Sequence, residues 1–161
     1  MTICNKTSSL DIANNIESLY FAIDETDVDA FYSLFIMKKV ANYLNIQLHY
    51  FDEPSEANNL GGCYRIFLNQ NQSSQKQWQD FGHELGHVLV HEGCQWGIPR
   101  LFRHYQEGQA RKFALHFCVP SFLLKQLNTI DIHLLMKTFN VEQNFALQRI
   151  EMYKNELLDA L

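Results

Sequence analysis

Apolar residues recur every three or four positions over the first third of the chain, and this spacing predicts two amphipathic helices. The first run begins after Ser8 and Ser9, either of which can cap the start of a helix. Its predicted apolar face consists of Ile12, Ile16, Leu19 and Ile23. The second run starts after Asp27. Its predicted apolar face consists of Phe31, Leu34, Phe35, Val40 and Leu44.

Two short aromatic segments follow, and a polar stretch separates them. Residues 47–51 and 63–69 are rich in aromatic and apolar side chains, which favours strands. Pro54 ends the first segment. Residues 56–62 are polar and finish in two glycines, which predicts a turn, and residues 70–74 read as a second polar turn. We expect the two strands to belong to a small antiparallel sheet.

The helical spacing returns in the second half of the chain. Residues 75–92 and 100–118 each carry an apolar helical face, and the loop 93–99 between them contains glycine and proline. Pro120 ends the second of these helices. Shorter helices are expected at 121–127, 130–139 and 141–161. This order of elements predicts one α+β domain with helices packed around a small sheet.

Composition narrows the class of protein. Hydrophobic residues make up 47% of the 161 positions and charged residues 19%, so general disorder is excluded. No uncharged apolar stretch reaches the ~18 residues of a membrane span, and the N-terminus lacks the pattern of a secretory signal. The net charge is −5 and no basic cluster stands out, so we expect neither a membrane nor a nucleic acid as a direct partner.

The spacing of the cysteines bears on the cellular compartment. The cysteines are Cys4, Cys63, Cys94 and Cys118, and no two of them form a CxxC pair. Spacing of this kind does not favour a zinc–thiolate site, so reduced thiols in a cytoplasmic protein are the simplest expectation.

One segment carries recognisable chemistry, the HExxH motif formed by His83, Glu84 and His87. Residues four apart lie on one face of a helix, so both imidazoles can converge on one tetrahedral zinc ion. Glu84 lies ~100° around the helix from His83 and can reach a metal-bound water without ligating the metal. That position suits a general base. Two surface histidines on an ordinary amphipathic helix are the alternative.

A third protein ligand is needed. His91 lies eight residues after His83, ~12 Å along a straight helix, and Glu92 lies farther still, so neither can share an ion with His83. The metzincin pattern would place Gly at 90 and His at 93, and it fails here. The remaining competitors are His104 and Glu107. Glu107 shares its helical face with two alanines that allow a close approach, which favours it as the ligand.

The segment from Glu107 to Pro120 resembles a motif of the ImmA/IrrE metallo-endopeptidases, ExxAxxFAxxxxxP, and meets it at every fixed position. Residues 64–69 resemble the family's strand before the zinc helix, and residues 139–149 resemble its later helical segment. The resemblance covers about residues 62–149. Two departures are present: Gln109 stands where the family frequently has a second Glu, and Cys118-Val119 stands where it frequently has Leu-Met. Arg111 stands where a thermolysin-like site would have Asp.

The resemblance implies a zincin-like fold and a cytoplasmic zinc protease, with His83, His87 and Glu107 as metal ligands and Glu84 as base. Residues 1–161 then form one metallopeptidase domain, with a helical region at 1–45 and the catalytic core at 46–161. ImmA-type members are encoded on phages and mobile elements, where they cleave or antagonise a helix-turn-helix repressor. A DNA-binding repressor is accordingly the expected protein partner, and the protein would act as an anti-repressor.

Two other functions are compatible with the motif, and several residues are candidates for contacting the substrate. A metal-containing module could sequester a repressor without cutting it, although a structural site needs no base such as Glu84. A small amidase with a diffusible substrate is equally compatible with the motif. Zincins commonly hold substrate on a sheet edge, for which residues 64–69 and Tyr64 are the candidates. His104 and Tyr105 are candidates for binding the oxyanion, and Gly86 is expected to allow close helix packing.

Overall fold

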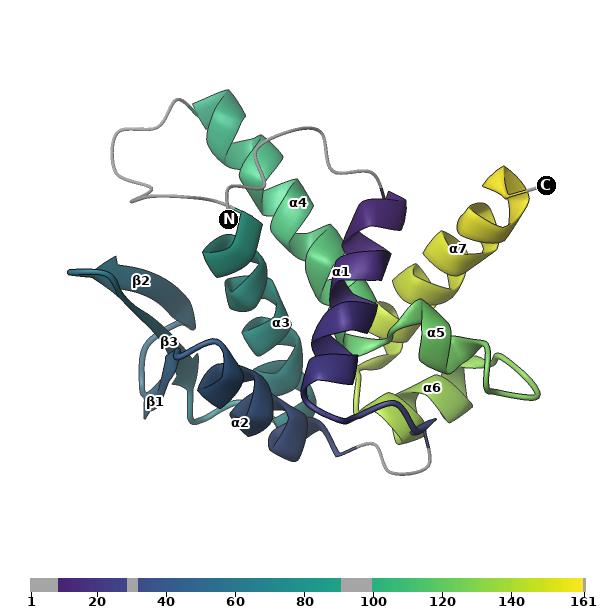
Figure 1. Cartoon of the computed structure of the whole chain (residues 1–161), viewed down its shortest axis with the longest axis horizontal. Helices are drawn as coiled ribbons and strands as arrows, with labels where there is room; N and C mark the ends of the chain where they lie inside the picture. The colour runs from purple at the N-terminus through teal and green to yellow at the C-terminus, as the bar shows by residue number, and fades with distance from the viewer. Residues whose placement is uncertain (1–8, 29–31, 91–99, 161) are drawn as a thin grey trace.

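The computed structural model describes residues 9–28, 32–90 and 100–160 of the chain (Figure 1). Its elements in chain order are α1 (Ser9–Ala22), α2 (Ser33–Tyr43), β1 (Gln47–Phe51), β2 (Glu56–Leu60), β3 (Cys63–Asn69), α3 (Ser74–Val90), α4 (Arg100–Cys118), α5 (Ser121–Leu124), α6 (Ile132–Phe139) and α7 (Gln143–Asp159). Helices precede and follow a small sheet, and this order confirms the predicted α+β class.

The two N-terminal helices differ in how well their buried faces follow the apolar pattern. All the residues predicted for the first face are buried, three of them in α1 and the last directly after it: Ile12, Ile16, Leu19 and Ile23. α2 buries Val40 as predicted, together with Ile36, Met37 and Ala41, which were not predicted. The prediction that Leu34 and Phe35 face the core is therefore wrong, because they are 52% and 50% exposed. Phe35 lies beneath the Lys39 ammonium, 4.5 Å from ring centre to Nζ, which is a cation–π contact.

The sheet has three strands in the order β1-β3-β2. β2 pairs antiparallel with β3, but β1 runs parallel to β3, so the sheet is mixed and the expectation of an antiparallel sheet is corrected. A parallel neighbour needs a crossover connection, and the chain between β1 and β3 supplies one by way of β2. Because β3 lies in the middle, residues 64–69 are not the sheet edge, and β1 and β2 are the edge strands.

β2 occupies a stretch that composition predicts to be a turn. Its sequence is Glu-Ala-Asn-Asn-Leu, which is poor in strand-forming residues. The turn itself is only Gly61–Gly62, where φ is +62° and +84°. Positive φ at both central residues is the geometry of a tight two-residue hairpin, and glycine adopts it without strain. The hairpin pairs Leu60 with Cys63, so the strand follows from its partner rather than from its own sequence.

α3 lies between the sheet and α4, and it packs closely against both (Figure 1). α4 has the predicted bounds, and α3 begins one residue before its expected start. Gly86 makes the approach of α3 to α4 tight: a Cβ there would lie 3.1 Å from the Cα of Ala110 and 3.2 Å from its carbonyl oxygen. The core at this contact is aromatic, with Trp78 and Phe117 rings 5.0 Å apart. The HExxH motif therefore lies on a helix that packs tightly against α4.

The C-terminal helices α5, α6 and α7 lie where helices were expected, with shorter bounds. α6 begins at Ile132 because Asp131 caps it, its side chain accepting a hydrogen bond from the backbone N–H of Leu134. Asn140 ends the same helix in the left-handed conformation, φ +51°. These local signals explain why α6 and α7 are separate helices.

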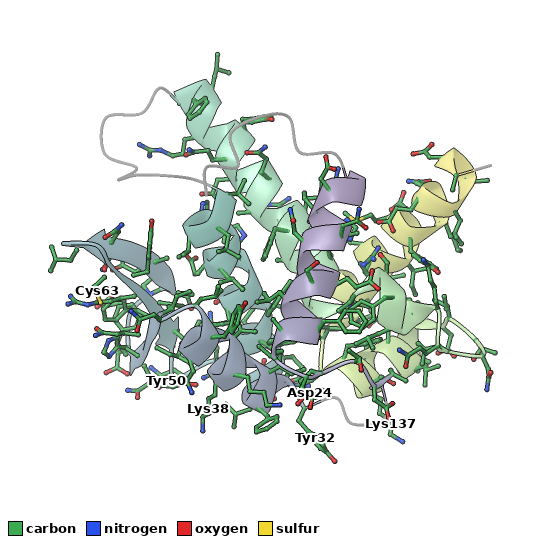
Figure 2. The ribbon with its side chains drawn as sticks, in the orientation of Figure 1. Asp24, Tyr32, Lys38, Tyr50, Cys63 and Lys137 are labelled. Carbon is green, nitrogen blue, oxygen red and sulfur yellow. The ribbon has the colours of Figure 1, made fainter. Side chains whose placement is uncertain are left out.

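Some expectations fall outside the described residues, namely Phe31, His91, Glu92, the loop 93–99 and the cysteines Cys4 and Cys94. Cys63 begins β3 and is half-buried (Figure 2), whereas Cys118 is buried on α4, and both are free thiols. No helix within the described ranges is both long and apolar enough to cross a membrane.

Candidate metal centre

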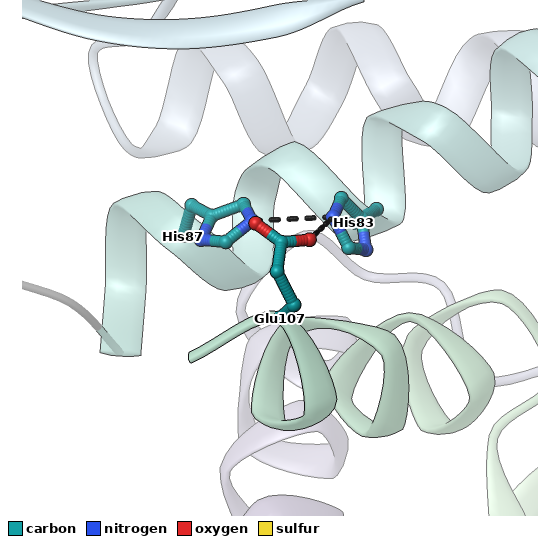
Figure 3. Close-up of side chains that lie close together, drawn as sticks. All are labelled: His83, His87 and Glu107. Atoms are coloured by element: carbon teal, nitrogen blue, oxygen red, sulfur yellow. Dashed lines mark hydrogen bonds and ion pairs between the residues drawn. The ribbon is translucent and has the colours of Figure 1, made fainter. Parts of the chain in front are cut away.

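Two helices bring three metal-ligating side chains to one point. α3 places His83 and His87 one turn apart with their rings 4.8 Å from centre to centre, and α4 brings Glu107 opposite them (Figure 3). The Nε2 atoms of the two histidines are 3.1 Å apart. Glu107 Oε2 lies 3.1 Å from His83 Nε2, and Glu107 Oε1 lies 3.3 Å from His87 Nε2. All three donor groups thus face a common centre.

These separations fit a tetrahedral ion. Ligand atoms ~2.0–2.1 Å from a metal and ~109° apart as seen from it are about 3.3 Å from one another. The two Nε2 atoms are 3.1 Å apart, each has one oxygen of the Glu107 carboxylate at 3.1 or 3.3 Å, and one ligand atom from each residue lies within 4.8 Å of the other two. Among the residues that the structure describes, this trio is the group of His, Cys, Asp and Glu side chains able to hold a metal ion. Three protein ligands leave a fourth position open, as catalytic sites do.

The surroundings favour the neutral imidazole that ligates metals. Burial lowers the pKa of His83, and the nearby carboxylate of Glu107 offsets part of that effect. The side chains of His83 and Glu107 are 28% and 41% exposed, whereas His87 is 9% exposed. The centre is therefore anchored at His87 and open to solvent on the side of Glu107.

Glu84 lies beside the trio on α3 and is buried. Burial, followed by the like charges of Asp80 and Glu107, raises the pKa of Glu84 to about 8. A backbone hydrogen bond from Ala57 in β2 opposes this rise and ties the carboxylate to the edge strand of the sheet. A carboxyl group whose pKa is raised toward neutrality next to a metal site is suited to accept and release protons.

The three residues predicted to contact the substrate or the oxyanion lie at different positions relative to Glu107. His104 precedes Glu107 by three residues and shares its side of α4, ~60° away around the helix. Tyr105 lies ~160° from Glu107 and is 53% exposed, and its hydroxyl accepts a hydrogen bond from Gln109 Nε2 at 3.0 Å. Tyr64 is half-buried in β3, where it pairs with Asn59 of β2. Helix geometry thus puts His104, and not Tyr105, on the same side of α4 as Glu107.

Sequence reasoning missed two groups near the centre. Asp80 contributes its charge to both His83 and Glu84, and Ser55 and Lys76 hold its carboxylate. The signal for Asp80 was available, because it precedes His83 by three residues on the same helical face. The backbone N–H of Ala57 could not be found in this way, since β2 was not expected to be a strand.

Known proteins resemble the chain over the region that contains this centre. Residues 35–151 match the family model described as the IrrE N-terminal-like domain, Peptidase_M78. The Phage-like element PBSX protein XkdA of Bacillus subtilis (strain 168) is 41% identical over 123 residues, which are 73% of this chain and 62% of that protein. The Uncharacterized protein YqaB of the same organism is 32% identical over 151 residues, 91% of this chain and 86% of that protein. The chain thus matches less than two-thirds of the PBSX protein's length.

Proposed function

The chain belongs to the IrrE N-terminal-like peptidase family, and from this premise we propose that it is a zinc-dependent endopeptidase. One observation carries the proposal: His83, His87 and Glu107 converge at separations that suit one ion, with Glu84 beside them. A donor set of two imidazoles and one carboxylate with an open fourth position is the arrangement of catalytic zinc in other peptidases. A site with a purely structural metal has no need of the fourth group, Glu84.

The chain's own residues would divide the chemistry. His83, His87 and Glu107 would hold the zinc, which supplies a Lewis acid that polarises a carbonyl and makes water a stronger acid. Glu84 accepts the proton that the attacking water loses and then donates it to the leaving amine. β2, the edge strand next to α3, is the candidate for pairing with an extended substrate. Its Ala57 already contacts Glu84, so a substrate strand along β2 would lie beside the base.

The proposed substrate is a helix-turn-helix repressor of a phage or mobile element, and its cleavage would relieve repression. Support comes from the relative XkdA, which is a protein of a phage-like element. The acidic balance of the chain, −5, is compatible with a basic DNA-binding substrate. Sequestration of the repressor without cleavage is the competing function, and the test below separates the two.

The test uses purified protein, the repressor encoded beside its gene, and the Glu84→Gln variant. Wild type should carry about one zinc per chain and should cut the repressor into defined fragments. Glu84→Gln keeps the shape of the side chain but removes the base, so cleavage should fall about 100-fold or more while zinc and fold remain. Elemental analysis, circular dichroism and mass spectrometry of the fragments provide the measurements. An intact repressor that is bound and released from DNA by both proteins would refute the endopeptidase and favour sequestration.

A further inference from the structure

α4 presents two chemically different sides around Glu107. At 100° per residue, four basic or imidazole side chains lie within ~60° of the metal-facing carboxylate. They are Arg100, Arg103, His104 and Arg111. The opposite side of the same turns carries Leu101, Phe102 and Tyr105, all of them exposed. Ala110, which packs against Gly86 of α3, lies ~60° from Glu107 in the direction opposite to Arg111, so the exposed Arg111 borders the metal-facing carboxylate on the side away from this helix contact.

Two of these basic side chains, Arg103 and Arg111, are exposed and have no carboxylate partner among the described residues. The concentration of charge is unusual for this chain, because its net charge is −5. Cations gathered on one face of an otherwise acidic protein mark a surface for an anionic group.

The sheet side of the centre carries negative charge. Glu56 of β2 and Asp80 of α3 both raise the pKa of Glu84, so their negative charges lie on the side of the sheet. Arg111 acts in the opposite sense on α4, since its charge lowers the pKa of His83. Arg111 also lies one helical turn after Glu107 and ~40° from it around α4, so its exposed side chain starts beside the metal-facing carboxylate. A substrate bound between β2 and α4 would meet negative charge near β2 and positive charge near α4.

We propose that Arg111, assisted by Arg103, determines specificity by binding a carboxylate of the substrate on the α4 side of the metal centre. The carboxylate is either an Asp or Glu side chain or the C-terminus of the substrate. The inference rests on the proposed peptidase function. The two arginines lie four residues before and after Glu107, ~6 Å along the helix axis in each direction. An extended substrate covers about 7 Å in two residues, so the acidic group is expected within two residues of the scissile bond.

Arginine suits this role because its planar guanidinium binds a carboxylate through two parallel hydrogen bonds. The thermolysin-like pattern has an acidic residue at the position of Arg111, so the charge at this point of the site is reversed in this chain. An exposed ion pair of this kind weakens with salt, whereas a purely steric preference does not.

The cleavage test profiles bonds cut in a proteome-derived peptide library by wild type, Arg111→Glu, Arg111→Lys and Lys154→Glu. Lys154 is exposed on α7 and controls for the change in net charge. We expect Asp and Glu to be enriched within two residues of the bonds cut by wild type and Lys154→Glu. Arg111→Glu should lose that enrichment by about tenfold or more and favour Lys or Arg, while Arg111→Lys keeps part of it. Acidic enrichment that survives Arg111→Glu overturns the inference and leaves the peptidase function standing.

Binding provides a second readout in the Glu84→Gln background. The probes are fluorescent alanine hexapeptides with a single Glu, Gln or Lys at each position in turn, each with a free and with an amidated C-terminus. Arg111→Glu should weaken binding of the Glu peptides about tenfold and leave the Gln peptides unchanged, with the difference shrinking in high salt. Selectivity that depends on the free C-terminus alone assigns the carboxylate to the substrate's end. Acidic selectivity without any cleavage would support the inference and refute the peptidase, and equal binding of Glu and Gln peptides would overturn the inference.

Discussion

α4 carries two clusters of histidine and glutamate, and only one of them is arranged to hold an ion. The metal centre lies at Glu107, in the first half of the helix. The buried polar cluster lies at the other end, where His116 is 3.4 Å from Glu156 Oε1. The residue types are alike, yet their charge balance differs. At the metal centre a carboxylate meets two imidazoles, whereas at the polar cluster the carboxylate already has a cation.

That cation is Arg149, which is fully buried. It donates hydrogen bonds to Glu156 at 3.1 Å, to the Ser121 hydroxyl at 2.6 Å and to the Val119 carbonyl at 2.9 Å. Arg149 thus donates to a carboxylate, a hydroxyl and a carbonyl of the protein itself. In this protein the His–Glu contact with metal-ligand geometry is the one whose carboxylate forms no ion pair with Lys or Arg among the described residues, and the other carboxylate is already paired with Arg149.

The largest expected effect separates Glu107 from its neighbour His104. Glu107→Ala removes one of three ligands from the metal centre, so we expect stoichiometric metal to be lost and cleavage to be abolished. His104→Ala should keep the metal, because the structure places it outside the trio. Metal content by elemental analysis and recovery of apo-protein activity on adding zinc measure the difference. Metal lost from the His104 variant and kept in the Glu107 variant would mean that the trio is wrongly assigned.

The next prediction breaks the buried polar cluster. Arg149→Met leaves the carboxylate of Glu156 without its cation, so the free energy of unfolding should fall by about 3–5 kcal/mol. Metal content should not change. Lys154→Met, at an exposed position of the same helix, is the control and should shift stability by less than about 0.5 kcal/mol. Denaturant titrations measure both, and equal stability of the two variants would show that Arg149 is not structural.

A smaller effect is expected from the pH dependence of His116. Burial, then the charges of Arg149 and Lys112, lowers the pKa of His116 to about 3, despite the nearby carboxylate that Arg149 shares. As the pH falls through ~6.5 the unfolded chain binds a proton that the folded protein refuses, so stability decreases toward acid pH and is fully present above pH ~7. The loss attributable to His116 should reach about 2 kcal/mol at pH 5.

The measurement compares unfolding at pH 7 and pH 5 for wild type and His116→Leu, which cannot titrate at this position. The difference in pH dependence between them isolates the imidazole. His133→Leu, an exposed position on α6, should behave as wild type. An unchanged pH dependence in His116→Leu would mean that the buried imidazole does not resist protonation.

The smallest prediction concerns the approach of α3 to α4. A Cβ at Gly86 meets the backbone of Ala110 and Cβ of Phe113 at 3.1–3.2 Å, and these atoms cannot move aside easily. Gly86→Ala should therefore lower stability by about 1 kcal/mol even after its gain in helix propensity. It should also weaken metal binding, because the two helices that supply the ligands are pushed apart. Gly108→Ala meets nothing within 4 Å and should instead stabilise by up to about 1 kcal/mol. Equal shifts in both variants would show that the helix contact tolerates a methyl group.

The sequence was most informative where a local pattern carries the structure. The HExxH spacing places two imidazoles on one helical face whatever surrounds them, and the apolar repeat of α4 gives its bounds directly. The sequence was least informative where hydrogen bonding to a partner strand decides whether a segment is a strand and in which direction it runs. β2 contains Asn58 and Asn59 and becomes a strand only by hydrogen bonding to β3, and the parallel direction of β1 leaves no trace in its own residues. Tyr105 is a different case, because the predicted helix at 100–118 and its 100° per residue already place Tyr105 ~160° from Glu107.

Because Glu107 comes from a different helix than the two histidines, the metal centre exists only while α3 and α4 are packed together. An ion bound there would bind the folded chain and not the unfolded one. Folding and metal supply would then be thermodynamically linked: each tenfold rise in free metal above the dissociation constant adds about 1.4 kcal/mol to the free energy of unfolding. The melting temperature of the protein would consequently report the concentration of available metal.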